Sequence, residues 1–234
     1  MFGLAFAVAF VVHLLLFSVS PMVHVLMAEM YLSHAQFGLI FSAAMVSLIV
    51  FRIPWGLVAD RRGYVGVLRL ALVISAVAAG LRAVSSGYTG LLLSQIVLGL
   101  GLAALMPCLS LMVKAWASAR PGLGTGIYFS GFAVGNATAL ALTPLLLDMM
   151  SWRQAFLLYG AAPVVVLLAS FMLGRNGEEA SSSVRLQEFG LVLRERVVWV
   201  LLILMVGSMG CYDTLASWMP RVLQMKGLEP GFAS

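Results

Sequence analysis

Long apolar stretches separated by short polar segments are the feature that most constrains this chain. Each stretch is long enough, as a helix, to cross about 30 Å of hydrocarbon. Hydrocarbon offers the backbone no hydrogen-bond partners, so a spanning segment must be a helix or part of a closed barrel, and a barrel strand needs only roughly ten residues. The sequence therefore predicts a bundle of transmembrane helices. The predicted spans are Leu4–Met27, Gln36–Val58, Val65–Val84, Gly90–Val113, Gly122–Leu147, Gln154–Leu173 and Val198–Met219.

The composition excludes a water-soluble protein. Of the 234 residues, 62% are hydrophobic and 10% are charged, whereas a soluble domain carries about 25% charged residues. The first apolar stretch has no basic residue ahead of it and no small-residue cleavage site, which predicts a retained span and not a signal peptide. Cys108 and Cys211 both lie inside apolar stretches and cannot build a disulfide framework or a zinc site. No metal or cofactor is expected.

The basic residues are distributed unevenly among the connections, which predicts the orientation of the chain. The connections after the second, fourth and sixth spans hold Arg61, Arg62, Lys114, Arg120, Arg175, Arg185, Arg194 and Arg196, with Arg69 close behind. The other connections hold only Arg82, Arg153, Arg221 and Lys226. Because basic loops stay in the cytoplasm, we expect a multi-pass protein of the cell membrane with a cytoplasmic N-terminus. The net charge of +5 then reflects membrane orientation, and no nucleic-acid partner is expected.

One long hydrophilic stretch divides the chain. Residues 174–196 contain Gly177, Glu178, Glu179 and a run of serines, and they predict a cytoplasmic linker. This linker would join a six-helix transmembrane half, residues 1–173, to the start of a second half, residues 197–234. The second part holds the seventh predicted helix and the segment after it.

A motif at the junction of the second and third spans carries a family resemblance. Residues 56–63 read GLVADRRG. They resemble the signature loop of the major facilitator superfamily, in which a glycine is followed by an aspartate, a basic residue and a second glycine. The resemblance implies that Gly56, Asp60, Arg61 and Gly63 form a conformational latch between two halves of a transporter at the cytoplasmic face. The alternative is a positive-inside hairpin with no further role.

Two further stretches resemble the same family. Residues 151–156, SWRQAF, are similar to the common start of its sixth helix, and Trp218-Met219-Pro220 followed by Gly227 is similar to the end of its seventh. The resemblance covers almost the whole chain and implies an all-α membrane protein with a major facilitator-type helix bundle. A complete member has about twelve helices in two six-helix halves. About seven are expected in this chain, which would be C-terminally truncated, with the missing half as its partner.

Arg52 carries the hypothesis about substrate. It lies about 12 Å along the helix from Asp60 and is the only Lys or Arg predicted to be deep within the spans of the first half. An arginine there costs at least about 2.5 kcal/mol on insertion scales, so it needs a cavity, a partner or a ligand. Snorkelling toward the headgroups is the alternative. The residues around Arg52, FRIP, resemble the second helix of the nitrate/nitrite porters, and there is weak similarity to the cyanate porters, which implies an anion held by two parallel hydrogen bonds.

Two polar residues are expected to line the substrate cavity beside Arg52. Many relatives carry an arginine four residues before a glycine of the fourth span, and here Gln95 holds that position before Gly99. Asn136 of the fifth span adjoins a stripe of small residues at every fourth position, which predicts close helix packing, with a sliding surface during transport as the alternative. The stripe consists of Gly131, Gly135, Ala139 and Thr143.

His13 of the first span and Asp213 of the seventh are candidates for proton coupling. Imidazole and carboxylate groups in a low-dielectric site are able to take up and release a proton near neutral pH. A histidine hydrogen-bonded to a neighbouring helix is the alternative for His13.

The absence of several sequence motifs excludes some classes of function. The sequence has no phosphate loop, no H-E-x-x-H and no G-x-S-x-G, so no nucleotide-driven pump and no enzyme is expected. The expected function is secondary active transport of a small solute by alternating access, with a small inorganic or organic anion as the substrate. Proton-coupled export of an organic metabolite or drug is one alternative. A polytopic membrane sensor without transport activity is another, which a soluble signalling domain downstream would favour.

Overall fold

The computed structural model describes residues 1–177 and 194–225 of the chain. It divides into two compact units, Met1–Ser181 and Ser182–Ser234, and each is described by itself. The described part of both units consists of helices and their connections, without a strand. The all-α prediction is therefore confirmed. The predicted linker falls largely on residues 178–193, which lie outside the described part, as do residues 226–234.

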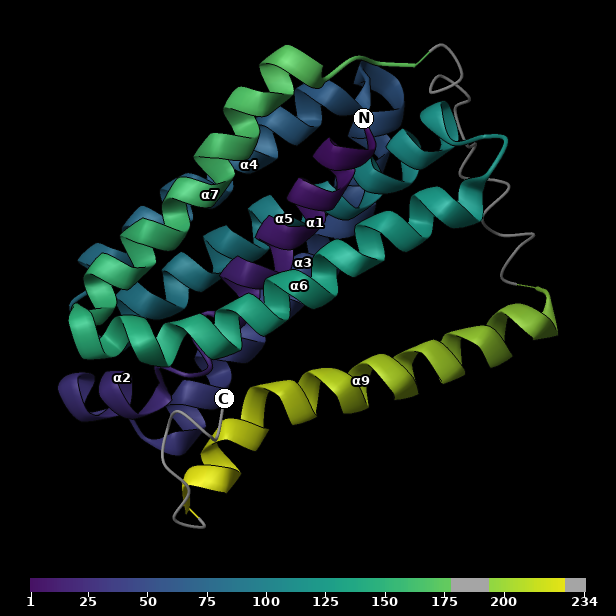
Figure 1. Ribbon diagram of the computed structural model, residues 1–234. Helices are drawn as coiled ribbons and strands as arrows, with labels where there is room; N and C mark the ends of the chain where they lie inside the picture. The colour runs from purple at the N-terminus through teal and green to yellow at the C-terminus, as the bar shows by residue number, and fades with distance from the viewer. Residues whose placement is uncertain (178–193, 226–234) are drawn as a thin grey trace. The chain divides into compact units, whose positions relative to one another are not determined.

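The first unit contains seven described helices, which follow the first six predicted spans because the first span is divided in two (Figure 1). Five of them, α3 to α7, are long and apolar enough to cross a membrane. The bounds of α3, α5 and α6 are wider than the predicted spans by a few residues at either end, α7 starts slightly earlier and ends at the predicted residue, and α4 agrees almost residue for residue. The helices are α1 (Phe2–Phe17), α2 (Val23–Met30), α3 (His34–Arg62), α4 (Tyr64–Val84), α5 (Tyr88–Trp116), α6 (Pro121–Met149) and α7 (Trp152–Leu173).

Local sequence signals explain where several helices begin. The Ser33 hydroxyl accepts a hydrogen bond from the Gln36 N–H at 3.2 Å, and the Gln36 side chain accepts one from the Ser33 N–H at 2.9 Å. The same reciprocal capping box, formed by Ser151 and Gln154, opens α7. Such boxes satisfy backbone donors that have no partner within the helix. Pro121 stands at the first position of α6, where a missing N–H costs nothing.

The first predicted span is broken near its C-terminal end, which corrects the expectation of one continuous helix over Leu4–Met27. Helix α1 ends at Phe17, and α2 starts again at Val23 in a different direction (Figure 1). Pro21 lies in the gap and has no N–H to donate to the Phe17 carbonyl. That carbonyl instead accepts the N–H of Ser20 at 3.1 Å. Proline at this position thus explains the break.

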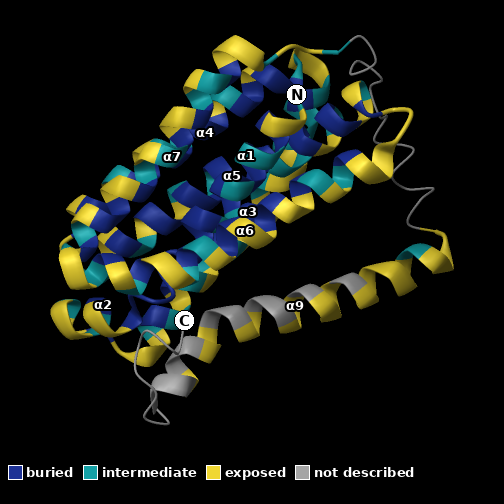
Figure 2. Ribbon diagram, in the orientation of Figure 1, coloured by how far each residue is buried: buried dark blue, intermediate teal, exposed yellow. Residues whose placement is uncertain are grey.

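The core of the first unit lies along α5 and α1. Figure 2 shows both helices mostly buried, while α6 and α7 expose a large part of their surface. The most extensive contacts join α5 to α3 and α4, α1 to α6, and α4 to α7. Hydrogen bonds from side chains to backbone support the α3–α5 pair, since the Ser47 hydroxyl donates to the Ile96 carbonyl at 2.8 Å and the Trp55 indole donates to the Leu100 carbonyl at 3.0 Å.

The second unit contains one described helix, α9 (Arg196–Met225), which covers the seventh predicted span. Its described apolar side chains, among them Trp199, Ile203 and Val206, are exposed within the unit. Asp213 falls in this helix, but its side chain is outside the described part, so the proton-coupling expectation for it stays a prediction.

Candidate functional site

The signature loop occupies the end of α3 and a one-residue junction to α4. Gly63 is that junction, with a φ of +85°, a backbone conformation that side-chain-bearing residues rarely adopt. A Cβ there would also lie 2.8 Å from the Asn176 side chain. Arg61 is exposed, Asp60 is partly exposed, and Gly56 lies against Pro107 of α5. The predicted latch residues therefore lie at one end of the bundle, with Asp60 and Arg61 open to a partner.

A network that the sequence analysis missed holds the start of the predicted linker against this loop. The Asn176 side chain accepts a hydrogen bond from the Val65 N–H at 3.1 Å. The Tyr64 hydroxyl donates to the Arg175 carbonyl at 2.6 Å and accepts a hydrogen bond from the Trp116 indole at 2.8 Å. Because Val65 lies in the first turn of α4, Asn176 satisfies a donor that the helix itself leaves open. The contacts span 111 residues, and no local pattern could have indicated them.

Arg52 lies on α3 with its side chain exposed in the first unit. Leu48 and Ala44, one and two turns earlier on the helix, are buried, so Arg52 borders the packed stripe of α3. Within the described residues no carboxylate lies within ion-pair distance of it. A guanidinium without such a counterion keeps its donors for water, headgroups or a ligand.

Aromatic side chains of α1, α3 and α6 form a continuous cluster. The His13 ring lies 5.5 Å from that of Phe17 and 4.4 Å from that of Phe132. Phe17 continues the cluster to Phe41 of α3, with ring centroids 6.1 Å apart. Phe132 continues it along α6 to Tyr128 and Phe129. His13 Nδ1 is buried and has no hydrogen-bond partner among the described residues. The predicted proton carrier thus sits on an aromatic surface.

The predicted cavity residues Gln95 and Asn136 are both buried within the first unit, with 1% and 4% of their surfaces exposed. Asn136 follows Gly135, where α6 approaches α1 so closely that a Cβ would overlap the Phe10 carbonyl. A Cβ at Gly131 would lie 2.5 Å from the Phe6 carbonyl oxygen. The predicted stripe of small residues therefore faces α1, and Ala139 in the same stripe is fully buried.

The position of Arg82 differs from the prediction made from the sequence. It was expected in an outer connection, but it belongs to α4 and is completely buried. Its guanidinium donates to the Leu15 carbonyl at 2.8 Å and to the Gln95 side-chain oxygen. Arg52 is therefore not the only arginine within the spans of this unit. The side chain turns inward because its donors find acceptors there, which a count of charges by connection does not detect.

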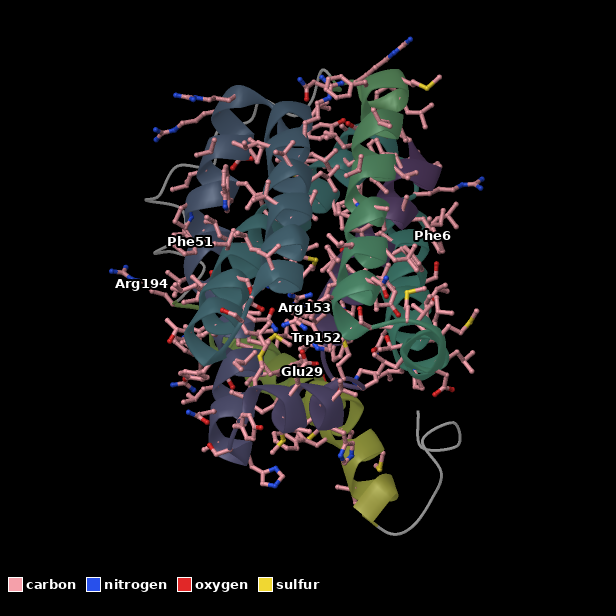
Figure 3. The ribbon with its side chains drawn as sticks, turned by 90° about the vertical axis from the view of Figure 1, so that its left-hand side faces the viewer. Phe6, Glu29, Phe51, Trp152, Arg153 and Arg194 are labelled. Atoms are coloured by element: carbon pink, nitrogen blue, oxygen red, sulfur yellow. The ribbon has the colours of Figure 1, made fainter. Side chains whose placement is uncertain are left out.

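Glu29 of α2 joins two residues at the start of α7, and Figure 3 shows the three side chains converging. The Trp152 indole donates to Glu29 Oε2 at 2.5 Å, and the Arg153 guanidinium forms an ion pair with Glu29 Oε1 at 2.5 Å. Glu29 lies beyond the predicted first span. The hydrogen bonds from Arg153 and Trp152 lower the pKa of this carboxyl. Arg153 also lies over the Trp152 ring, 4.1 Å from its centroid. The cluster joins α2 to the start of α7.

Comparison with known proteins identifies the family. Residues 5–234 match the Major Facilitator Superfamily profile. An uncharacterized transporter of Bacillus subtilis, YycB, is 26% identical over 92% of this chain and 54% of its own length. A gallate transporter of Pseudomonas putida is 29% identical over 61% of this chain and 32% of its own length. The chain thus spans about half, or less, of the length of these relatives.

A solved structure shares the fold. The crystal structure of a bacterial homologue of the human lysosomal transporter Spinster, inward-facing and unoccupied, matches 99% of this chain and 56% of its own with a TM-score of 0.77 at 17% identity. The predicted helix bundle of major facilitator type is therefore confirmed. Its relatives are transporters and not enzymes. The chain belongs to the Major Facilitator Superfamily, and it is a multi-pass membrane protein of a transporter family.

Proposed function

We propose that this chain forms the first six-helix half and the seventh helix of a secondary transporter that moves a small anion by alternating access. Family membership supports the transporter and a small-molecule solute. The preference for an anion is supported by one observation: two arginines of the first unit, Arg52 and Arg69, lie within its spans away from the helix ends, whereas its described carboxylates all lie at helix ends.

The charge distribution can be followed residue by residue. Arg52 lies inside α3 and Arg69 lies inside α4, each more than one turn from the end of its helix. The described carboxylates of this unit are Glu29, Asp60 and Asp148, each within the last turn of its helix. Charges in a low-dielectric environment act more strongly than charges in water. We expect a bundle with this arrangement to favour an anionic solute over a cationic one.

Arg52 is the residue we assign to substrate binding. It is exposed on α3 and has no carboxylate partner among the described residues. Its planar fork suits a carboxylate or nitrite, because both present two oxygens to parallel donors. The names of several relatives support an anion, since they include a gallate transporter, the 4-hydroxybenzoate transporter PcaK and a nitrite extrusion protein.

Among anions, an aromatic carboxylate has the most support. The cluster of His13, Phe17, Phe41 and Phe132 offers aromatic faces and edges, and its member Phe41 belongs to α3, the helix that carries Arg52. Aromatic rings pack against each other in stacked or edge-to-face arrangements. His13 is the residue we assign to proton coupling in this unit, with Asp213 as the candidate in α9. Proton-coupled export of an organic metabolite remains the alternative function.

The orientation belongs to the same proposal. The basic connections support a cell-membrane protein whose N-terminus and residues 174–196 lie in the cytoplasm. A cysteine in place of Ser182 is then expected to react with a membrane-impermeant reagent from the cytoplasmic side only. Reaction of this cysteine from the outside would contradict the proposed orientation.

The test of the function is uptake by the full-length protein in proteoliposomes. The panel contains benzoate, 4-hydroxybenzoate, gallate, galactonate and nitrite, each with and without a proton gradient. We expect saturable uptake of at least one aromatic carboxylate and an increase with the gradient. Absence of saturable uptake for all five anions would contradict the proposed substrate class and favour the alternative of organic export.

A further inference from the structure

Arg82 has an environment that transport of a solute does not by itself explain. Its guanidinium donates through Nη1 to the Leu15 carbonyl at 2.8 Å and to the Ser18 hydroxyl at 3.4 Å, and through Nη2 to the Gln95 side chain. The guanidinium carbon also lies 5.2 Å from the centroid of the Phe156 ring. The side chain is fully buried, and no carboxylate of the described chain pairs with it. A buried cation therefore joins α1, α4, α5 and α7 through neutral groups.

The burial of Arg82 is unexpected for a residue at this position on its helix. Arg82 is in the last turn of α4, which ends at Val84. An arginine so close to a helix end is able to extend its charge toward the headgroups at little cost. Instead it turns into the protein, where desolvation of a charge is expensive. Contacts within the bundle must hold it there.

Two acceptors of Arg82, the Leu15 carbonyl and the Ser18 hydroxyl, are available because the first span is broken. The carbonyls in the last turn of a helix have no partner within the helix and carry its partial negative charge. Leu15 is in that turn of α1 and Ser18 follows the helix end. The Leu15 carbonyl accepts the Ser18 hydroxyl at 2.9 Å in addition to Arg82. The guanidinium thus occupies the place where the broken helix offers the most negative group.

The cluster is not optimised for stability. Arg82 Nε and Gln95 Nε2 are buried without a hydrogen-bond partner among the described residues. A partly satisfied polar network costs more than apolar packing of the same volume. Such a network instead favours one defined arrangement of the helices that it joins.

We propose that Arg82 is a positioning residue that fixes the break in the first membrane helix and, with it, the direction of α2. Gln95 holds the guanidinium from α5, and the Leu15 carbonyl and Ser18 hydroxyl receive it at the end of α1. The far end of α2 is held separately, by Glu29 on Trp152 and Arg153. The segment between Phe17 and Met30 is therefore fixed at both ends. This inference is independent of the proposed substrate.

Hydrogen exchange of the full-length protein in lipid nanodiscs tests the proposal, with peptide-level detection by mass spectrometry. Arg82→Met keeps the length of the side chain and removes the charge. It should speed exchange of the amides of residues 18–23 by about tenfold, since several of their hydrogen bonds are made within the break. The control is Arg69→Met, because Arg69 donates to the Ser170 carbonyl of α7 at 2.9 Å. That variant should leave residues 18–23 unchanged and speed exchange near Ser170.

An exchange of partners separates positioning from general packing. Arg82→Gln alone should behave as Arg82→Met, whereas Arg82→Gln combined with Gln95→Arg returns a guanidinium to the same acceptors from α5 and should restore slow exchange at residues 18–23. If Arg82→Met fails to fold, hydrogen exchange at residues 18–23 in the double variant tests the proposal on its own. Slow exchange in the double variant supports the proposal. Fast exchange in it, or unchanged exchange in Arg82→Met, would overturn the proposal.

Discussion

Asn176 accepts a hydrogen bond from the backbone N–H of Val65 at 3.1 Å, so a residue beyond the sixth span caps the helix that follows the signature loop. The Tyr64 hydroxyl, one residue earlier, donates to the carbonyl of Arg175. The first residues of the predicted linker are therefore attached to the loop that family resemblance links to conformational change. A displacement of this segment would act directly on the start of α4.

Asn176→Ala should lower the thermal stability of the protein in detergent. It removes the cap of the Val65 N–H, and loss of such a cap costs about 1 kcal/mol. Asn176→Asp keeps the acceptor and adds a negative charge at a helix N-terminus, so it should be as stable as the parent or more stable. Equal melting temperatures for the alanine variant and the parent would show that the contact contributes nothing.

Asp60→Asn should leave folding and insertion intact and reduce transport by the full-length protein at least about tenfold, or about 1.4 kcal/mol. The substitution keeps the shape of the side chain and removes the charge assigned to the latch. Asp148→Asn is the matched control, since Asp148 is an exposed carboxylate at the end of α6. If Asp60→Asn at equal expression takes up solute as the parent does, the loop is a hairpin with no role as a latch.

Glu29 should contribute a pH-dependent part of the stability. Its pKa is lowered in the folded state, chiefly by the hydrogen bond from Arg153, so its contribution is present above the ordinary glutamate pKa of about 4.3 and is lost as the pH falls through the folded value. The melting temperature of the parent should exceed that of Glu29→Gln by a constant amount between about pH 5 and pH 8. Below about pH 4 the two should converge. A difference that persists or grows there would contradict the assignment.

Gly135→Ala should destabilise the α1–α6 pair. The added methyl group would overlap the Phe10 carbonyl, and overpacking of this kind costs about 1–3 kcal/mol. Gly126→Ala on the same helix is the control, because nothing lies within 4 Å of a Cβ there. That variant gains helix propensity and should be slightly more stable than the parent. Thermal unfolding of the two variants side by side measures the difference.

The sequence predicts the helices well because hydropathy and charge report on each segment separately. Span three, Val65–Val84, agrees with α4 almost residue for residue. The break after Phe17 was missed although Pro21 signals it, since proline is tolerated in many membrane helices. The family resemblance also located the signature loop, whose Gly63 has the positive φ that a glycine permits.

Contacts between distant segments are the part that the sequence could not predict. Arg82 was assigned to an outer connection because charge alone does not reveal whether a side chain turns inward. Its acceptors, Leu15 and Gln95, belong to two other helices. The cap of α4 by Asn176 depends on how α7 ends beside α4, which no periodicity encodes. Whether Arg52 faces substrate depends on surfaces beyond the first unit and stays a prediction.

Arg52 is assigned to anion binding, and the concentration dependence of labelled 4-hydroxybenzoate uptake by the full-length protein in proteoliposomes tests this assignment. Arg52→Lys keeps the charge but replaces a two-pronged donor by a point donor, so it should raise the half-saturating concentration at least about tenfold. Arg52→Gln should reduce uptake nearly to background. Arg62→Lys, at the exposed end of the same helix, should behave as the parent. Parent-like uptake in both Arg52 variants would contradict the account.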